Sequence, residues 1–179
     1  MSKNIVLLFG SPRKNGNTAK LVASFVEGAE SVGKIVTLFH VADMKISFCI
    51  GCSHCFEEKG VCIHKDDMQK ILDSIRNADT LVFASPVYYC SVSAQLKLAL
   101  DRTCALTNEQ TSIKRAALLM TCADKRTDTA DGAVVMYKSV LAYKNWDNAG
   151  IVIAPGLYGE ISIHGREELE QARKLGKEI

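Results

Sequence analysis

Four cysteines stand close together in the sequence, at Cys49, Cys52, Cys55 and Cys62. Two residues lie between the first and second cysteines and two between the second and third, which lets three thiolates converge on one centre. A short loop can then bring the fourth cysteine to the same centre. Four thiolates are the ligand set of a [4Fe–4S] cluster or of a structural zinc ion. Gly51 frees the backbone between the first two cysteines, as a tight ligand turn requires. The spacing therefore favours a metal centre that all four cysteines ligate.

Two alternatives for these cysteines stay open, a reversible disulfide and an empty loop. The longest apolar run has five residues, as in Ile5–Phe9, whereas an export signal needs about 7–15 and a membrane span about 18 or more. We therefore expect a cytoplasmic protein without a membrane segment, where clustered cysteines favour metal or redox chemistry. Cys90, Cys104 and Cys122 stand alone, and a lone cysteine is usually a small buried hydrophobic residue.

A second set of reactive side chains lies in the loop from Gly10 to Thr18, between an apolar run and a segment with helical spacing. Such a strand–loop–helix turn brings backbone N–H groups and the positive end of the helix dipole to one point, where an anion binds. Ser11, Asn17 and Thr18 add hydroxyl and amide donors, and Arg13 adds a positive charge. The alternative is a polar turn in which Asn17 or Thr18 only caps the helix.

The spacing within this loop indicates which phosphate it fits. A Walker A motif has four residues between its glycines, followed by Lys and then Ser or Thr. Here five residues separate Gly10 from Gly16, and Asn17 follows. The G-x-G-x-x-G fingerprint of dinucleotide sites is absent. A terminal monophosphate such as that of FMN remains.

The elements that position these loops are indicated by apolar runs that alternate with helical periodicity. Continuous apolar runs are typical of parallel strands covered on both faces, and β–α alternation predicts a doubly wound α/β sheet. We expect the flavodoxin-like order 2-1-3-4-5, with a ligand at the carboxyl ends of strands one and three. We predict strands at Ile5–Phe9, Ile35–Phe39, Thr80–Ala84, Ala116–Met120 and Ile151–Ala154, and helices near 21–29, 68–75, 94–103, 133–144 and 166–177.

The residues after the third strand form a second wall in this arrangement. Pro86 stiffens the turn, and Tyr88 and Tyr89 offer flat apolar faces with polar tips, which suit an isoalloxazine ring. The alternative for each tyrosine is partial burial or a subunit contact. Asp66, followed three residues later by Gln69, resembles a capping box.

Three motifs together resemble the NAD(P)H-dependent FMN reductases of the flavodoxin-like fold. They are Gly-Ser-Pro-Arg-Lys-Asn-Gly-Asn-Thr at 10–18, Ser-Pro-Val-Tyr-Tyr at 85–89 and Ser-Val-Ser-Ala-Gln-Leu-Lys at 91–97. The resemblance implies that Ser11, Arg13, Asn15, Asn17 and Thr18 hold the FMN phosphate. It also implies that the flavin is lined by Pro86, Val87, Tyr88 and Tyr89, with the loop Cys122–Asp131 as a third wall. The cysteine block is similar to that of the iron–sulfur flavoproteins.

We therefore expect one FMN-binding domain over residues 1–179, with a cysteine-rich loop at 41–65. The expected function is an FMN-dependent oxidoreductase or electron-transfer flavoprotein that carries a [4Fe–4S] cluster and uses NAD(P)H as electron donor. The alternatives are a cluster-free reductase of quinones, nitro compounds or flavins, and a non-catalytic electron carrier or thiol redox sensor. The expected partners are small-molecule or protein electron donors and acceptors, and the resemblance implies a homodimer or homotetramer.

The overall composition restricts the function further. Hydrophobic residues make up 47% of the chain and charged residues 23%, which excludes a mainly disordered protein. The net charge is +2, and the absence of a long block of like charge predicts no nucleic-acid partner. His40 has no partner visible in the sequence and is expected on the surface.

Overall fold

The computed structural model describes residues 4–107, 111–126, 128–159 and 163–179 of the chain. Within these ranges five strands form one parallel sheet in the order β2-β1-β3-β4-β5. This order confirms the expected fold class and topology. The strands are β1 (Asn4–Phe9), β2 (Ile35–His40), β3 (Thr80–Pro86), β4 (Arg115–Thr121) and β5 (Asp147–Ala154).

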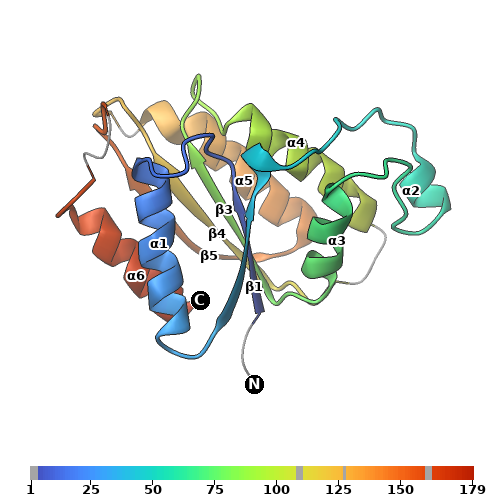
Figure 1. Ribbon diagram of the computed structural model, residues 1–179, viewed down its shortest axis with the longest axis horizontal. Helices are drawn as coiled ribbons and strands as arrows, with labels where there is room; N and C mark the ends of the chain where they lie inside the picture. Colours follow the sequence, from blue (N-terminus) through green and yellow to red (C-terminus); the bar gives the residue numbers. More distant parts are fainter. Residues whose placement is uncertain (1–3, 108–110, 127, 160–162) are drawn as a thin grey trace.

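Helices cover both faces of this sheet (Figure 1), with α1 and α6 on one face and α3, α4 and α5 on the other. Successive β1 side chains alternate between the two resulting cores, so that Val6 packs under α3–α5 and Leu7 packs under α1 and α6. The long helices are α1 (Asn17–Glu30), α3 (Met68–Arg76), α4 (Ala94–Arg102), α5 (Asp131–Lys144) and α6 (Glu167–Glu178). The short ones are η1 (Val41–Asp43), α2 (His54–Glu57), η2 (Thr103–Leu106) and η3 (Asp128–Ala130).

Strand β2 departs from the expectation that every strand is covered on both faces. It forms one edge of the sheet, and its side chains Ile35 and Leu38 are 55% and 44% exposed. Helix α1 packs chiefly against α6 and leaves this edge partly open. The apolar run therefore identified a strand correctly, but the prediction of its coverage was wrong.

The N-terminus of helix α4 packs against the loop that follows β1. Its N-cap residue Ser93 accepts a hydrogen bond from the backbone N–H of Leu96 (3.2 Å) and donates one to the carbonyl of Gly10 (2.6 Å). A Cβ atom at Gly10 would lie 2.5 Å from the Cβ of Leu96. The loop after β1 can therefore approach α4 this closely only because residue 10 is glycine.

The start of α3 does not use the expected capping box. The side chain of Gln69 donates to Asp73 (2.9 Å), further along the helix. The Asp66 carboxylate does accept from the backbone N–H of Met68 (3.1 Å), but it also binds a residue of α4. That prediction is wrong because a tertiary partner, described below, engages the carboxylate.

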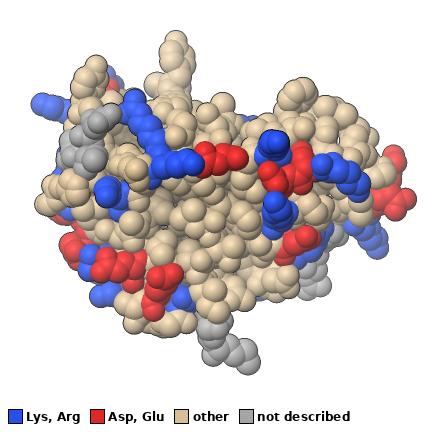
Figure 2. Space-filling view, viewed as in Figure 1, with Lys and Arg blue, Asp and Glu red and all other residues tan. Residues whose placement is uncertain are grey.

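Charges are mixed on the surface. Figure 2 shows Lys and Arg interspersed with Asp and Glu on the face viewed, with no broad area of one sign. No helix in the described part of the chain is both long and apolar enough to cross a membrane.

Candidate functional site

A cavity of about 400 Å³ opens at the carboxyl ends of β1, β3 and β4. Parallel α/β sheets bind ligands at this edge, at the point where the strand order reverses. Four sequence segments meet there, and three of them were predicted. The lining residues are Ser11, Arg13, Gly16, Asn17, Thr18, Pro86, Val87, Tyr88, Thr121, Cys122, Ala123, Leu157, Tyr158 and Gly159.

The phosphate loop, residues 10–18, forms one end of the cavity. Helix α1 begins after Gly16, which gives it no side-chain cap, and its first turn carries no acidic residue. The N–H groups of a helix's first turn have no partner within the helix, so here they are available to an anion. The Ser11 hydroxyl accepts from the backbone N–H of Arg13 (3.1 Å), which fixes the turn. Asn15 is exposed and is not among the residues that line the cavity.

Two buried side chains join the phosphate loop to the neighbouring strand. The hydroxyl oxygens of Thr18 and Thr121 lie 2.6 Å apart, and both side chains are buried. This bond connects the start of α1 to the end of β4. It holds two walls of the cavity in register before any ligand binds.

The wall after β3 is formed by Pro86, Val87 and Tyr88, as expected. Tyr88 and Ser91 pair across a tight turn through two backbone hydrogen bonds of 2.9 and 3.1 Å. The turn residues Tyr89 and Cys90 have positive φ angles of 47° and 64°, which are uncommon for side chains of this size. The turn leaves Tyr89 fully exposed, and Tyr89 is not among the cavity-lining residues.

The wall after β4 is only partly the one expected. Cys122 and Ala123 line the cavity, and burial raises the pKa of the Cys122 thiol. Beyond them, Asp124 and Asp128 bind neighbouring residues of their own loop instead. Thr127 lies outside the described residues.

The fourth wall was missed by the sequence analysis. Leu157, Tyr158 and Gly159 follow β5 and line the cavity. The amide of Asn17 donates to the carbonyl of Gly159 (3.4 Å) and accepts from the backbone N–H of Ile163 (3.2 Å). The rule that ligands lie at the carboxyl ends of strands would have indicated this segment had it been applied to the fifth strand.

The cysteine loop lies on the face of the sheet that α3, α4 and α5 cover. In Figure 1 its short helix α2 lies at the far right, beyond α3 and α4. Cys49 and Cys52 are exposed, and Cys55 and Cys62 are half-buried. Among the residues that the structure describes, no three or more His, Cys, Asp or Glu side chains are placed to hold a metal ion. The structure therefore does not assemble the predicted ligand set, and none of these cysteines lines the cavity.

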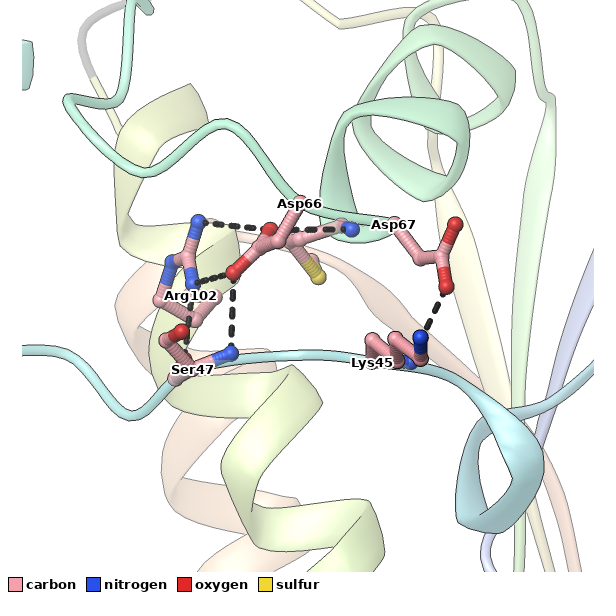
Figure 3. Close-up of polar contacts among 6 residues, drawn as sticks. Lys45, Ser47, Asp66, Asp67 and Arg102 are labelled. Atoms are coloured by element: carbon pink, nitrogen blue, oxygen red, sulfur yellow. Dashed lines mark hydrogen bonds and ion pairs between the residues drawn. The ribbon is translucent and has the colours of Figure 1, made fainter.

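The two ends of the cysteine loop are held together by a buried ion pair (Figure 3). Arg102 of α4 donates to both Asp66 oxygens at 2.8 and 3.2 Å and to the carbonyl of Ser47 at 2.7 Å. Ser47 in turn donates its backbone N–H to Asp66 (2.8 Å). Two further hydrogen bonds join the ends of the loop: the backbone N–H of Lys45 donates to the Asp67 carboxylate (2.9 Å), and the backbone N–H of Asp67 donates to the Lys45 carbonyl (3.0 Å).

Both partners of this pair are withdrawn from water, with side chains 1% and 11% exposed for Arg102 and Asp66. Burial by itself would raise the pKa of Asp66. The hydrogen bonds from Arg102 and from the backbone N–H groups of Ser47 and Met68 outweigh it and lower that pKa to about 2. The carboxylate therefore stays ionised throughout the physiological range.

Cys104 is close to the cysteine loop, although the sequence places it far away. It lies on η2, which packs against α2. Burial raises the pKa of the Cys104 thiol, and the nearby Cys55 and Cys49 raise it further. The expectation that Cys104 is isolated is therefore wrong. The sequence could not show this, because a contact between residues 55 and 104 leaves no local signal.

A scan against family models matches residues 3–144 to the family described as NADPH-dependent FMN reductase. An iron–sulfur flavoprotein of Archaeoglobus fulgidus is 30% identical over 186 residues, which cover 96% of this chain and 76% of that protein. An iron–sulfur flavoprotein of Methanocaldococcus jannaschii is 39% identical over 99 residues, covering 55% of this chain and 51% of that protein. The chain thus spans only about half the length of this second relative.

Solved structures show the same fold at lower identity. The NAD(P)H:quinone oxidoreductase from Methanothermobacter marburgensis has a TM-score of 0.76 at 18% identity, covering 99% of this chain and 96% of that one. An FMN-dependent NADH-azoreductase from Bacillus anthracis, solved in complex with FMN, has a TM-score of 0.68 at 15% identity, covering 98% and 97%.

Proposed function

Because the chain belongs to the NADPH-dependent FMN reductase family, we propose that the cavity at the strand ends binds FMN and that the protein is an FMN-dependent oxidoreductase. The observation that carries the proposal is the two-part character of the cavity. One end is the start of a helix with neither a side-chain cap nor an acidic residue, which suits a phosphate. The Pro86, Val87 and Tyr88 side offers the flat, largely apolar wall that suits an isoalloxazine ring.

The phosphate-binding role falls to Ser11, Arg13, Asn17 and Thr18. Of these, Ser11 and Thr18 are buried and already held by hydrogen bonds, so little ordering is needed when a ligand binds. Arg13 is exposed and would add charge from the rim. Asn15, which lies outside the cavity lining, is not included in this set.

When bound, the flavin supplies hydride acceptance and electron release, and the chain supplies binding and orientation. Backbone N–H groups of the loop would hold the phosphate, and the Thr18–Thr121 bond would keep that loop against β4. The segment 157–159 would exclude water from the side opposite Tyr88. NAD(P)H is the proposed electron donor, and a quinone, nitro compound or free flavin is the proposed class of acceptor.

The direct test is the titration of apoprotein with FMN, riboflavin and FAD, followed by stopped-flow reduction with NADPH and NADH. We expect FMN to bind most tightly and the bound flavin to bleach on mixing with a nicotinamide. Preference for FAD would contradict the proposed phosphate site. Flavin that binds but is not bleached by either nicotinamide would favour the non-catalytic electron carrier.

We also propose that the cysteine loop carries a [4Fe–4S] cluster in the anaerobic protein. The support is the spacing of Cys49, Cys52, Cys55 and Cys62 and the names of the curated relatives. Since the described cysteines do not converge, cluster assembly would require residues 48–65 to rearrange between the ends clamped by Arg102. No step of the flavin chemistry is assigned to the cluster.

Anaerobic reconstitution with iron and sulfide tests this second proposal, with Cys52→Ala as the variant. We expect wild type to take up about four irons per chain and the variant markedly fewer. Cys90→Ala is the matched control, since Cys90 is also exposed but lies outside the loop. Zinc in place of iron, or no uptake, would leave the cluster-free reductase.

The remaining expectations concern the whole protein. We propose one domain over residues 1–179, a homodimer or homotetramer, and a cytoplasmic location. Light scattering of the purified flavoprotein measures the oligomeric state, and a monomer would contradict that part. Fractionation of cells that express the tagged chain tests the location.

A further inference from the structure

His40, the last residue of β2, is bonded to the phosphate loop. Its ring nitrogen Nε2 lies 2.6 Å from the carbonyl oxygen of Ser11, and Nδ1 lies 2.8 Å from a carboxylate oxygen of Asp43. The ammonium of Lys14 lies 2.6 Å from the same carboxylate oxygen. The imidazole stacks on Phe9 at 4.7 Å between ring centroids and 20° between planes. The expectation that His40 is a surface residue without a partner is therefore wrong.

The partners of His40 determine how many protons its ring must carry. A backbone carbonyl can only accept a hydrogen bond, so Nε2 must donate to Ser11. The hydrogen bond from Lys14, followed by the contacts with His40, holds the pKa of Asp43 below its usual value despite some burial. An ionised carboxylate also only accepts, so Nδ1 must donate as well. Both hydrogen bonds can therefore form at once only when the ring is doubly protonated.

The carbonyl that His40 binds matters to the neighbouring cavity. Ser11 lines the cavity, whereas His40 lines a separate groove between α1 and β2. The Ser11 carbonyl is therefore directed out of the cavity, toward His40. A carbonyl oxygen turned inward would repel a phosphate, and Pro12, the next residue, has no N–H to offset it.

We propose that His40 is a positioning residue for the phosphate site: its doubly protonated ring holds the Ser11 carbonyl away from the cavity, so that the loop presents donors to a bound phosphate. This inference rests on the proposed function, in which the cavity takes FMN. When the ring loses one proton, either Ser11 or Asp43 faces a nitrogen lone pair, and the ring loses one of its two hydrogen bonds. Affinity for a phosphorylated flavin should then fall as the pH rises.

Other charged groups face the same groove and could contribute to a pH dependence of binding. Glu27 and Glu30 of α1 line it together with Lys14, and Glu27 is paired with Arg173 of α6 at 2.9 Å. Carboxylates and ammonium groups of these kinds ordinarily titrate well outside the interval from about pH 6 to pH 9. Histidine is the side-chain type that ordinarily titrates near the lower end of this interval.

The test is the equilibrium dissociation constant of the apoprotein for FMN and for riboflavin, measured at about pH 6 and about pH 9. The variant is His40→Gln, because the glutamine amide supplies an N–H donor near the former Nε2 and does not titrate. His164→Gln is the matched control, since His164 is exposed. The FMN phosphate itself titrates in this range, but it does so equally for every variant.

We expect the FMN affinity of wild type to fall about tenfold relative to that of His40→Gln between the two pH values, the effect of one lost charged hydrogen bond. The control should follow wild type. Riboflavin, which lacks the phosphate, should show less than about a twofold relative change. Nitrogen-15 NMR of the FMN complex at about pH 6 should show both His40 ring nitrogens protonated.

Each contrary result has a distinct meaning. Tight FMN binding with the same pH dependence in wild type and His40→Gln would overturn the inference alone, as would a neutral His40 ring. If neither wild type nor the control binds FMN, the proposed function fails. The NMR measurement on the wild-type apoprotein would then still decide whether the ring is cationic, and it does not depend on the folding of the variant.

Discussion

The cavity at the strand ends and the cysteine loop differ in how completely the fold assembles them. The cavity at the strand ends is held by buried bonds such as that between Thr18 and Thr121 at 2.6 Å. The cysteine loop is held at its ends by Arg102 and Asp66 and in its middle by a bond from Arg76 to the carbonyl of Gly60 (3.2 Å), but its four described cysteines are not placed to hold a metal ion. The fold therefore assembles the walls of the cavity, whereas it does not assemble the ligand set expected of the four cysteines.

The positions of the two regions in the chain explain this difference. Three of the four cavity walls follow directly from β1, β3 and β4, which are buried on both faces, so the core fixes where these walls begin. The cysteine loop is a long connection from β2 to α3, and several of its large apolar side chains are exposed, among them Phe48 at 71% and Ile50 at 53%. The first part of the loop is therefore exposed, whereas Cys55 and Cys62 pack against the core.

The largest expected effect comes from breaking the clamp on the cysteine loop. Arg102→Met should lower the free energy of unfolding by about 3–5 kcal/mol, because it leaves the largely buried Asp66 carboxylate without its partner. Urea unfolding followed by circular dichroism measures this. Lys97→Met removes an exposed ion pair of 2.6 Å on the same helix and should cost less than about 1 kcal/mol.

The double variant Arg102→Met/Asp66→Asn sharpens that result. It removes the unpaired charge and should recover part of the loss. Equal effects of Arg102→Met and Lys97→Met would show that the clamp contributes no more than a surface pair. The ends of the loop would then be held no more strongly than by an exposed ion pair.

A smaller effect should appear in the acid range. The pKa of Asp66 is lowered from 3.8 to about 2 in the folded protein, so its contribution is fully present above the unfolded pKa. That contribution is lost as the pH falls toward about 2, and it amounts to roughly 2 kcal/mol. Asp66→Asn, compared with wild type by urea unfolding between about pH 5 and pH 2.5, should lack this component. Parallel pH profiles would contradict it.

In the cavity, Thr18→Val should weaken FMN binding by about 1–2 kcal/mol, or roughly tenfold, because it removes a buried hydroxyl bond that fixes the loop. Fluorescence titration of the apoprotein measures this. Thr37→Val, an exposed position on β2, is the matched control. Iron uptake by the cysteine loop should not change in either variant. A loss of iron uptake in Thr18→Val would indicate that the two regions are not independent.

The smallest effects separate two adjacent tyrosines. Tyr88→Ala should weaken FMN by about 1 kcal/mol, since the proposed ring contact is lost. Tyr89→Ala should change the affinity by less than about twofold, because this side chain is fully exposed and outside the cavity. The same titration measures both. A larger effect for Tyr89 than for Tyr88 would indicate that the turn at residues 88–91 moves onto the flavin when it binds.

Much of the fold was determined by the sequence alone. The five apolar runs identify all the strands of the described sheet. For β1, β3 and β4 the reason is that strands buried between two helical layers must be apolar on both faces. The stripe of Met68, Ile71, Leu72 and Ile75 predicted the buried face of α3 correctly. The polar loop after β1 likewise identified one end of the cavity, since strand–loop–helix turns place N–H groups together whatever the rest of the chain does.

Only the tertiary structure decided which distant groups meet. The segment 157–159 joins the cavity, Cys104 lies beside the cysteine loop, and His40 reaches Ser11, across 29 to about 145 positions of chain. Asp66 looked like a helix cap because local spacing cannot show a partner on another helix. Periodicity records which face of an element is buried, but not what it is buried against. That choice depends on how the layers pack, and it determined the contacts that hold the cavity walls and the ends of the cysteine loop.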